Sequence, residues 1–197
     1  MHILRAADHR VMPWKNGGGS TTEIAVFPAN AGLDAFLWRV SMAGVSEDGP
    51  FSAFPAIDRS LAVLAGEGIV LEVEGQAAER VERESAPARF PGDVRTRASL
   101  VGGPILDLNV MTRRGRYAHR LTRHVAAARC GIVPEGEVAL LLSRSPGLDV
   151  GGQVLGVNDA ARLTGGVDVT PQGPSEFFLV ELWPETSGPE TSGPGRG

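Results

Sequence analysis

Gly, Pro, Asn and Asp divide the chain into short segments, and this spacing of turn residues most limits the folds open to it. No run of helical length keeps its apolar positions at a period of 3.6 residues. The segments are instead apolar or alternating runs of strand length, and many closely spaced strands are typical of a sandwich or barrel. We therefore predict an all-β antiparallel fold with little helix. The expected strands are residues 21–27, 36–45, 61–64, 69–73, 105–111, 138–142, 154–157 and 176–183.

Two local patterns refine this prediction. The apolar runs 61–64 and 69–73 are separated by Gly-Glu-Gly and are expected to form a hairpin. Residues 125–129 are expected to contain the chain's one short helical turn.

At the C-terminus the block Pro-Glu-Thr-Ser-Gly occurs twice, and such a composition cannot bury enough apolar surface to fold. We therefore predict that residues 185–197 form a disordered tail.

The charge balance and the single cysteine limit the classes of partner. The chain has 19 basic and 23 acidic residues, a net charge of −4, which argues against a nucleic-acid partner. Cys130 is the only cysteine, so neither an intrachain disulfide nor a thiolate zinc site is expected. No apolar run has the length of a membrane span, and the first residues lack the apolar core of a signal peptide. We expect a cytoplasmic protein without a membrane partner.

The densest group of unusual residues surrounds three consecutive glycines at 17–19. Trp14, Lys15 and Asn16 precede the glycines, which allow the backbone to pass close to a ligand. Thr21 and Glu23 follow on an expected strand, where alternate side chains share one face. The segment could instead be an ordinary solvated loop. A phosphate-binding loop is excluded, because the Gly-Lys-Ser/Thr order and a following helix are both missing.

Two further expected strands carry polar side chains at alternate positions. Asp107 and Asn109 share one face of residues 105–111, and Arg39 and Ser41 share one face of residues 36–45. These side chains either line a wet cavity or are solvated. Arg59 has the same two interpretations, and Asp58 is its partner if it lies on the surface.

The remaining titratable residues predict no further site. The four histidines have no spacing suited to a metal, and no Ser-His-Asp or Cys-His arrangement follows from the sequence. The arginines at 113, 114, 116, 120 and 123 are expected to form a solvated face.

Five motifs, taken in order, resemble those of the HutD/Ves family over about residues 3–183. The first is Trp-Lys-Asn-Gly-Gly-Gly-x-Thr-x-Glu-Ile, and residues 14–24 match every specified position. The others are Trp-Arg-Ile-Ser at 38–41 with Val40 for isoleucine, Asp-Gly-Pro-Phe-Ser-x-Phe-Pro-Gly-x-Asp-Arg at 48–59 with Ala56 for glycine, Phe-x-Gly-Asp at 90–93, and Asp-Leu-Asn-Leu-Met-x-Arg at 107–113 with Val110 for leucine. The change at Ala56 puts a turn with a positive φ at that position in question.

The resemblance implies a bicupin, in which two jelly-roll or β-barrel halves form one unit over residues 1–184, with approximate halves 1–115 and 116–184. It also implies a protein without cofactor or metal, associated with histidine utilisation, or in the Ves branch with stress. Family members resemble regulators that bind a pathway intermediate such as urocanate or formylglutamate, and the family implies no defined reaction.

With the family in view, the polar motif residues are expected to form one wall of a shared cavity that binds a small carboxylate metabolite. Arg39 or Arg59 would bind the carboxylate by a two-pronged hydrogen bond, Asn16 and Asn109 would orient the ligand, and Trp14 would cover its planar part. The candidate residues are Trp14, Lys15, Asn16, Thr21, Glu23, Arg39, Ser41, Arg59, Asp107 and Asn109.

Three alternatives stay open. Glu23 and Lys15 could form a structural ion pair. The protein could be an enzyme in which Glu23 or Asp107 acts as a base and Lys15 as an acid or a Schiff-base amine. It could also be a scaffold that only forms a homodimer, through strands at 36–45 or 176–183.

Overall fold

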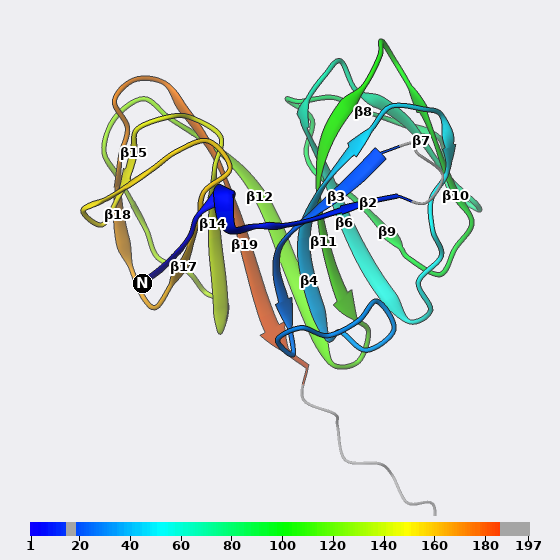
Figure 1. The fold of residues 1–197 in the computed structure, drawn as a ribbon, viewed down its shortest axis with the longest axis horizontal. Coiled ribbons are helices and arrows are strands. Elements are labelled where there is room, and N and C mark those ends of the chain that lie inside the picture. The colour runs from blue at the N-terminus through cyan, green and yellow to red at the C-terminus, as the bar shows by residue number, and fades with distance from the viewer. Residues whose placement is uncertain (15–18, 186–197) are drawn as a thin grey trace, which may run out of the picture.

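The computed structural model describes residues 1–14 and 19–185, and it consists of two β-barrels side by side (Figure 1). All strand pairs are antiparallel, and the short 3-10 helix Ala6–Asp8 is the only helical element assigned in these residues. This confirms the all-β prediction. No helix within the described ranges has the length and apolar character needed to cross a bilayer. The predicted tail lies outside these ranges, apart from Glu185.

The first barrel is built from two sheets. A six-stranded sheet has the order β2-β3-β4-β11-β6-β9, and a four-stranded sheet has the order β5-β10-β7-β8. The strands are β2 (Arg10–Pro13), β3 (Gly19–Phe27), β4 (Trp38–Val45), β5 (Gly49–Pro50), β6 (Ile57–Ala65), β7 (Ile69–Val73), β8 (Glu79–Val81), β9 (Ala88–Pro91), β10 (Thr96–Leu100) and β11 (Ile105–Arg113).

The second barrel repeats this plan with a five-stranded sheet, β1-β17-β14-β19-β12, and a four-stranded sheet, β13-β18-β15-β16. Its first strand, β1, comes from the N-terminus and pairs with β17, after which the chain crosses to the other barrel (Figure 1). The expected first half, 1–115, therefore contributes one strand to the second barrel. The strands are β1 (His2–Leu4), β12 (Tyr117–Ala126), β13 (Cys130–Ile132), β14 (Val138–Ser143), β15 (Leu148–Val150), β16 (Gln153–Leu155), β17 (Ala160–Leu163), β18 (Val167–Thr170) and β19 (Ser175–Pro184).

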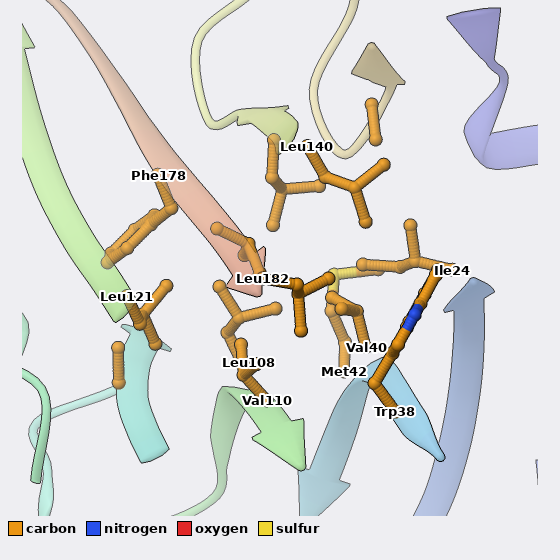
Figure 2. Close-up of a cluster of buried hydrophobic side chains, with 14 of the residues drawn as sticks. Ile24, Trp38, Val40, Met42, Leu108, Val110, Leu121, Leu140, Phe178 and Leu182 are labelled. Atoms are coloured by element: carbon orange, nitrogen blue, oxygen red, sulfur yellow. The ribbon is translucent and has the colours of Figure 1, made fainter. Parts of the chain in front are cut away.

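One apolar core joins the two barrels. The outer face of the six-stranded sheet contributes Trp38, Val40 and Leu108, and the five-stranded sheet contributes Phe178 and Leu182. Figure 2 shows these side chains meeting between the sheets, with Ile24 at one side. Alternation explains this core, because the same strands of the first barrel turn every second side chain toward the barrel interior.

The predicted hairpin at 61–73 is wrong. Strand β6 lies in the six-stranded sheet and β7 in the four-stranded sheet, so the Gly-Glu-Gly segment turns the corner between sheets. Gly66 and Gly68 have φ angles of +88° and +130°, and a Cβ on either would lie 2.6 Å from a backbone oxygen. A glycine-rich corner and a glycine-rich hairpin have the same local sequence requirements, and only the neighbouring strands distinguish them.

Other expectations need correction in the second half of the chain. The helical turn at 125–129 is wrong, because Val125 and Ala126 end β12 and pair with Glu176 and Ser175 of β19. The ten-residue strand β12 itself was not expected, because its polar residues hide the apolar alternation. Strand β16 covers only part of the expected run 154–157. Pairing between copies through β4 or β19 is not available, since each strand has hydrogen-bonded neighbours on both sides.

Candidate functional site

The strand register places the polar motif residues side by side on the inner face of the six-stranded sheet. Ser41 on β4 lies opposite Asn109 on β11, and Asp107 lies opposite Ala43. Met111, two residues further along β11, lies between Arg39 on β4 and Arg59 on β6. Because side chains on neighbouring strands in register share a face, these groups point into the same barrel.

This inner face forms the floor of a cavity of about 660 Å³ in the first barrel. Apolar walls are supplied by Met12, Leu33, Phe51 and Phe54, and Glu47 and Asp48 are exposed residues at its rim. The candidate residues that line it are Trp14, Thr21, Arg39, Ser41, Arg59, Asp107 and Asn109. Of the other candidates, Glu23 contacts a lining residue, whereas Lys15 and Asn16 lie outside the described residues.

Trp14 precedes the triglycine motif and Thr21 follows it, and their side chains form a hydrogen bond. The indole Nε1 of Trp14 donates a hydrogen bond to Thr21 Oγ1 at 2.8 Å. The backbone of Gly19 passes so close to Gly44 that an added Cβ would lie 2.1 Å from the Gly44 oxygen. The neighbouring strand therefore requires glycine at position 19. The backbone N–H of Trp14 donates a hydrogen bond to the Gly19 oxygen at 2.9 Å, and Trp14 lines the cavity.

Glu23 is paired with Arg39. The guanidinium Nε of Arg39 donates to Glu23 Oε2 at 2.7 Å, and the two side chains are only 6% and 15% exposed. A register shift between Glu23 and Ala25 accompanies this pairing, and it leaves Ile24 in the core between the barrels. Glu23 thus compensates the charge of one of the two cavity arginines.

Arg59, Asn109 and Asp107 form a buried hydrogen-bonded chain. Arg59 Nη2 donates to Asn109 Oδ1 at 2.7 Å, and Asn109 Nδ2 donates to Asp107 Oδ1 at 2.6 Å. The Arg59 guanidinium is enclosed by the rings of Phe51, 4.9 Å away, and Phe90, 5.1 Å away. Its Nε is buried and has no partner among the described residues.

Burial changes the proton affinities of both ends of this chain. Desolvation lowers the pKa of Arg59 to about 10, against the attraction of Asp107. Desolvation raises the pKa of Asp107 to about 7, against the attraction of Arg59 and the hydrogen bonds from the Ala43 backbone and Asn109. Asn109 stands between the two charges, so Asp107 compensates Arg59 without touching it.

A comparison with protein families identifies the chain. The family model described as HutD matches residues 6–178. The chain belongs to the HutD family. The match confirms the resemblance carried by the five motifs.

Relatives within this family include a Pseudomonas putida protein named for the 3′ region of hutC, which is 38% identical over 192 residues, covering 92% of this chain and 97% of the relative. Protein Ves of Citrobacter koseri is 41% identical over 113 residues, covering 55% of this chain and 58% of Ves. The structure of HutD from Pseudomonas fluorescens SBW25 is similar at a TM-score of 0.80 with 34% identity, covering 94% and 99% of the two chains.

More distant structures share the fold alone. YhhW from Escherichia coli has a TM-score of 0.65 at 9% identity, and a cupin 2 barrel protein from Leptotrichia buccalis has 0.53 at 10%. The pairing of two barrels in this HutD-family chain is therefore a cupin-like arrangement, as the family resemblance implied. In the described ranges, no group of three or more His, Cys, Asp and Glu side chains is placed to hold a metal ion.

The HutD motif turn at residue 56 is retained although alanine replaces glycine. Ala56 has a φ of +56°, and its neighbours fix it through two hydrogen bonds. Its N–H donates to Asp93 Oδ2 at 3.3 Å, and its carbonyl accepts from the Arg114 N–H at 2.9 Å. The turn thus keeps the left-handed conformation that the substitution had put in question.

Trp14 was predicted as an aromatic wall of the site, but Phe51 and Phe54 were not. Phe51 and Phe54 stood in the second long motif, yet only its charged end was singled out. Their signal was the placement of two aromatic residues just before Arg59, which now lies against both rings. The arginines expected to form a solvated face are instead paired in part: Arg114 contacts Asp58 and Asp93, and Arg120 contacts Glu135 and Glu181.

The second barrel has a different interior. Leu141, Leu148 and Phe177 are fully buried members of its apolar cluster. The buried polar chain and the 660 Å³ cavity both belong to the first barrel. The interiors of the two cupin-like barrels thus differ: the first has a buried polar chain beside its cavity, and the second has an apolar cluster.

Proposed function

We propose that this HutD-family protein binds a small carboxylate metabolite in the first barrel, without a metal, and regulates histidine utilisation through that binding. The observation that carries the proposal is the buried guanidinium of Arg59 facing a cavity of about 660 Å³. Arginine is well suited to carboxylate recognition, because its planar fork matches the two oxygens. Arg39 supplies a second cation, whose positive charge is compensated by its ion pair with Glu23.

The rest of the cavity supports a ligand with a planar or apolar body. Phe51, Phe54 and Trp14 line it, and such walls with a few placed polar groups are typical of small-molecule sites. Urocanate and formylglutamate combine a carboxylate with a body of this size. The hutC-region name of the Pseudomonas putida relative supports a pathway of histidine breakdown. The Pseudomonas fluorescens HutD structure is one of a formate condition, and formate is the smallest carboxylate probe.

The test is calorimetric titration at pH 7 with urocanate, N-formylglutamate and formate. We expect saturable heat with one of the two metabolites and loss of at least tenfold in affinity in Arg59→Gln, because one charge-assisted hydrogen bond is worth roughly 1.5–3 kcal/mol. Arg114→Gln is the matched control, since Arg114 is paired with Asp58 and Asp93 on the exterior. Unchanged affinity in Arg59→Gln, or no heat with any of the three, would overturn the proposal.

A second candidate is an enzyme that uses acid–base chemistry without a cofactor. The observation in its favour is Asp107, a buried carboxyl whose pKa is raised to about 7 by desolvation and which faces the cavity. Glu23 is the weaker candidate base, because it is already paired with Arg39. Incubation of each metabolite with the protein distinguishes the two functions. Progressive product that disappears in Asp107→Asn supports an enzyme, and binding without product supports a binding protein.

A further inference from the structure

The charges around the cavity are nearly balanced before any ligand enters. Glu23 neutralises Arg39 by direct contact, and Asp107 balances Arg59 through Asn109. A carboxylate bound at Arg59 would therefore be a second negative charge, beside Asp107, on a group that holds one cation. Burial of an unbalanced charge is costly, and proteins commonly avoid it by binding a proton.

We infer that the cavity binds its anion together with one proton, which Asp107 takes up from solvent. This inference rests on the proposed function and adds how pH regulates the site and which residue responds to pH. No bond between heavy atoms changes; a buffer acid gives up its proton, an O–H bond forms on the Asp107 carboxylate, and the complex gains one anion and one proton. Neutral Asp107 then leaves the full charge of Arg59 to the ligand.

Asp107 is placed for this exchange. It is only 1% exposed, and its contact with Arg59 passes through Asn109, so the attraction that keeps it ionised is weaker than in a direct ion pair. When an anion lies against Arg59, its repulsion cancels much of that attraction. The pKa of Asp107, about 7 in the empty cavity because of desolvation, should then rise further.

The other charged groups that face this space do not provide the proton site. Arg39 on β4 lines the cavity and is paired with Glu23 on β3. From the rim the cavity receives Glu47 and Asp48, which are exposed to solvent, and Asp48 accepts a hydrogen bond from the Leu100 N–H at 2.7 Å. The facing strand β10 contributes only Ala98 to the lining, and Lys15 lies outside the described residues. Asp107 is therefore the described carboxyl best placed to respond.

Linkage gives the sign of the effect. Because ligand binding favours the protonated form of Asp107, protonation must favour ligand binding by the same factor. With a pKa near 7 in the free protein, the dissociation constant should be about tenfold larger at pH 8 than at pH 6. At pH 8 close to one proton should be taken up for each anion bound.

The experiment titrates the wild-type protein with N-formylglutamate and with formate, whose carboxyl groups stay ionised from pH 6 to 8. Urocanate is left out because its own imidazole titrates in this range. At pH 8, heats measured in phosphate and in Tris give the number of protons taken up. We expect a number near one, and an affinity that falls about tenfold from pH 6 to pH 8. This measurement needs no variant.

Asp107→Asn mimics the neutral carboxyl at nearly constant shape. It should bind more tightly than the wild type at pH 8, with no proton uptake and a flat pH profile. Asp58→Asn, an exposed carboxylate on the neighbouring strand β6, is the control and should keep the wild-type profile. Binding with no proton uptake, or affinity that rises with pH, would overturn this inference and leave the proposed function standing. Absence of binding by every carboxylate overturns both.

Discussion

Arg39 and Glu23 form an ion pair inside the first barrel, with Arg39 Nε 2.7 Å from Glu23 Oε2 and both side chains largely buried. Both residues belong to the motifs that identify the HutD family. The pair uses one of the two cavity arginines for structure, which leaves Arg59 as the main anion-binding group in the proposed function.

The losses of stability on removing Glu23 and Arg39 should not be additive, because the two side chains interact directly. Glu23→Ala and Arg39→Ala should each lower the free energy of unfolding by about 2 kcal/mol, since each leaves a charged group largely buried without its partner. The double variant should lose less than the sum by about 1 kcal/mol, measured by urea unfolding. The exposed pair Arg80–Glu82 is the control and should show a coupling below about 0.5 kcal/mol. Additive losses for Glu23 and Arg39 would contradict a direct interaction.

Ala56→Gly should stabilise the protein. Ala56 holds a φ of +56°, a conformation that costs a residue with a Cβ more than it costs glycine. After the greater entropy of glycine in the unfolded chain is subtracted, we expect a gain of about 0.5–1 kcal/mol in the free energy of unfolding. The reverse change at Gly75, with φ +82° and open space around an added Cβ, should cost about as much. A loss of stability in Ala56→Gly would show that the turn is not strained.

His119 should make the protein sensitive to acid. Its Nδ1 lies 2.7 Å from Thr112 Oγ1 and its Nε2 lies 2.8 Å from Ser60 Oγ, so this side chain of the second barrel joins β6 and β11 of the first. Desolvation, with a contribution from Arg89, lowers the pKa of His119 to about 4. The unfolded chain then binds more protons between pH 4 and 6.5, and stability falls as the pH falls through that window.

The expected loss from this histidine is about 2 kcal/mol between pH 7 and pH 5. Urea unfolding at the two pH values measures it. His119→Gln keeps a polar group between Ser60 and Thr112 but cannot be protonated, so its stability should change less over the same range. Equal pH dependence in the wild type and the variant would assign the acid sensitivity to other groups.

The sequence alone determined the fold class and the faces of the central strands. Alternation in residues 105–111 and 38–41 correctly separated Asp107, Asn109, Arg39 and Ser41 from the apolar residues of the core, because the side-chain period of a strand is a local property. The five motifs likewise determined the family, since a long unusual string needs no structure to be matched.

Only the tertiary structure decided which strands are neighbours, and with them the partners of the charged groups. The Gly-Glu-Gly segment at 66–68 is compatible with a hairpin or a corner, and the packing of two sheets selected the corner. The pairing of β3 with β4 brought Glu23 into contact with Arg39. The pairing of β11 with β6 placed Asn109 between Arg59 and Asp107. The pKa of Asp107 depends on its burial and on the charge of Arg59, which is more than forty residues away in the chain. A sequence states which residues can ionise, but their proton affinities arise from the solvent that folding removes and the charges that it brings together.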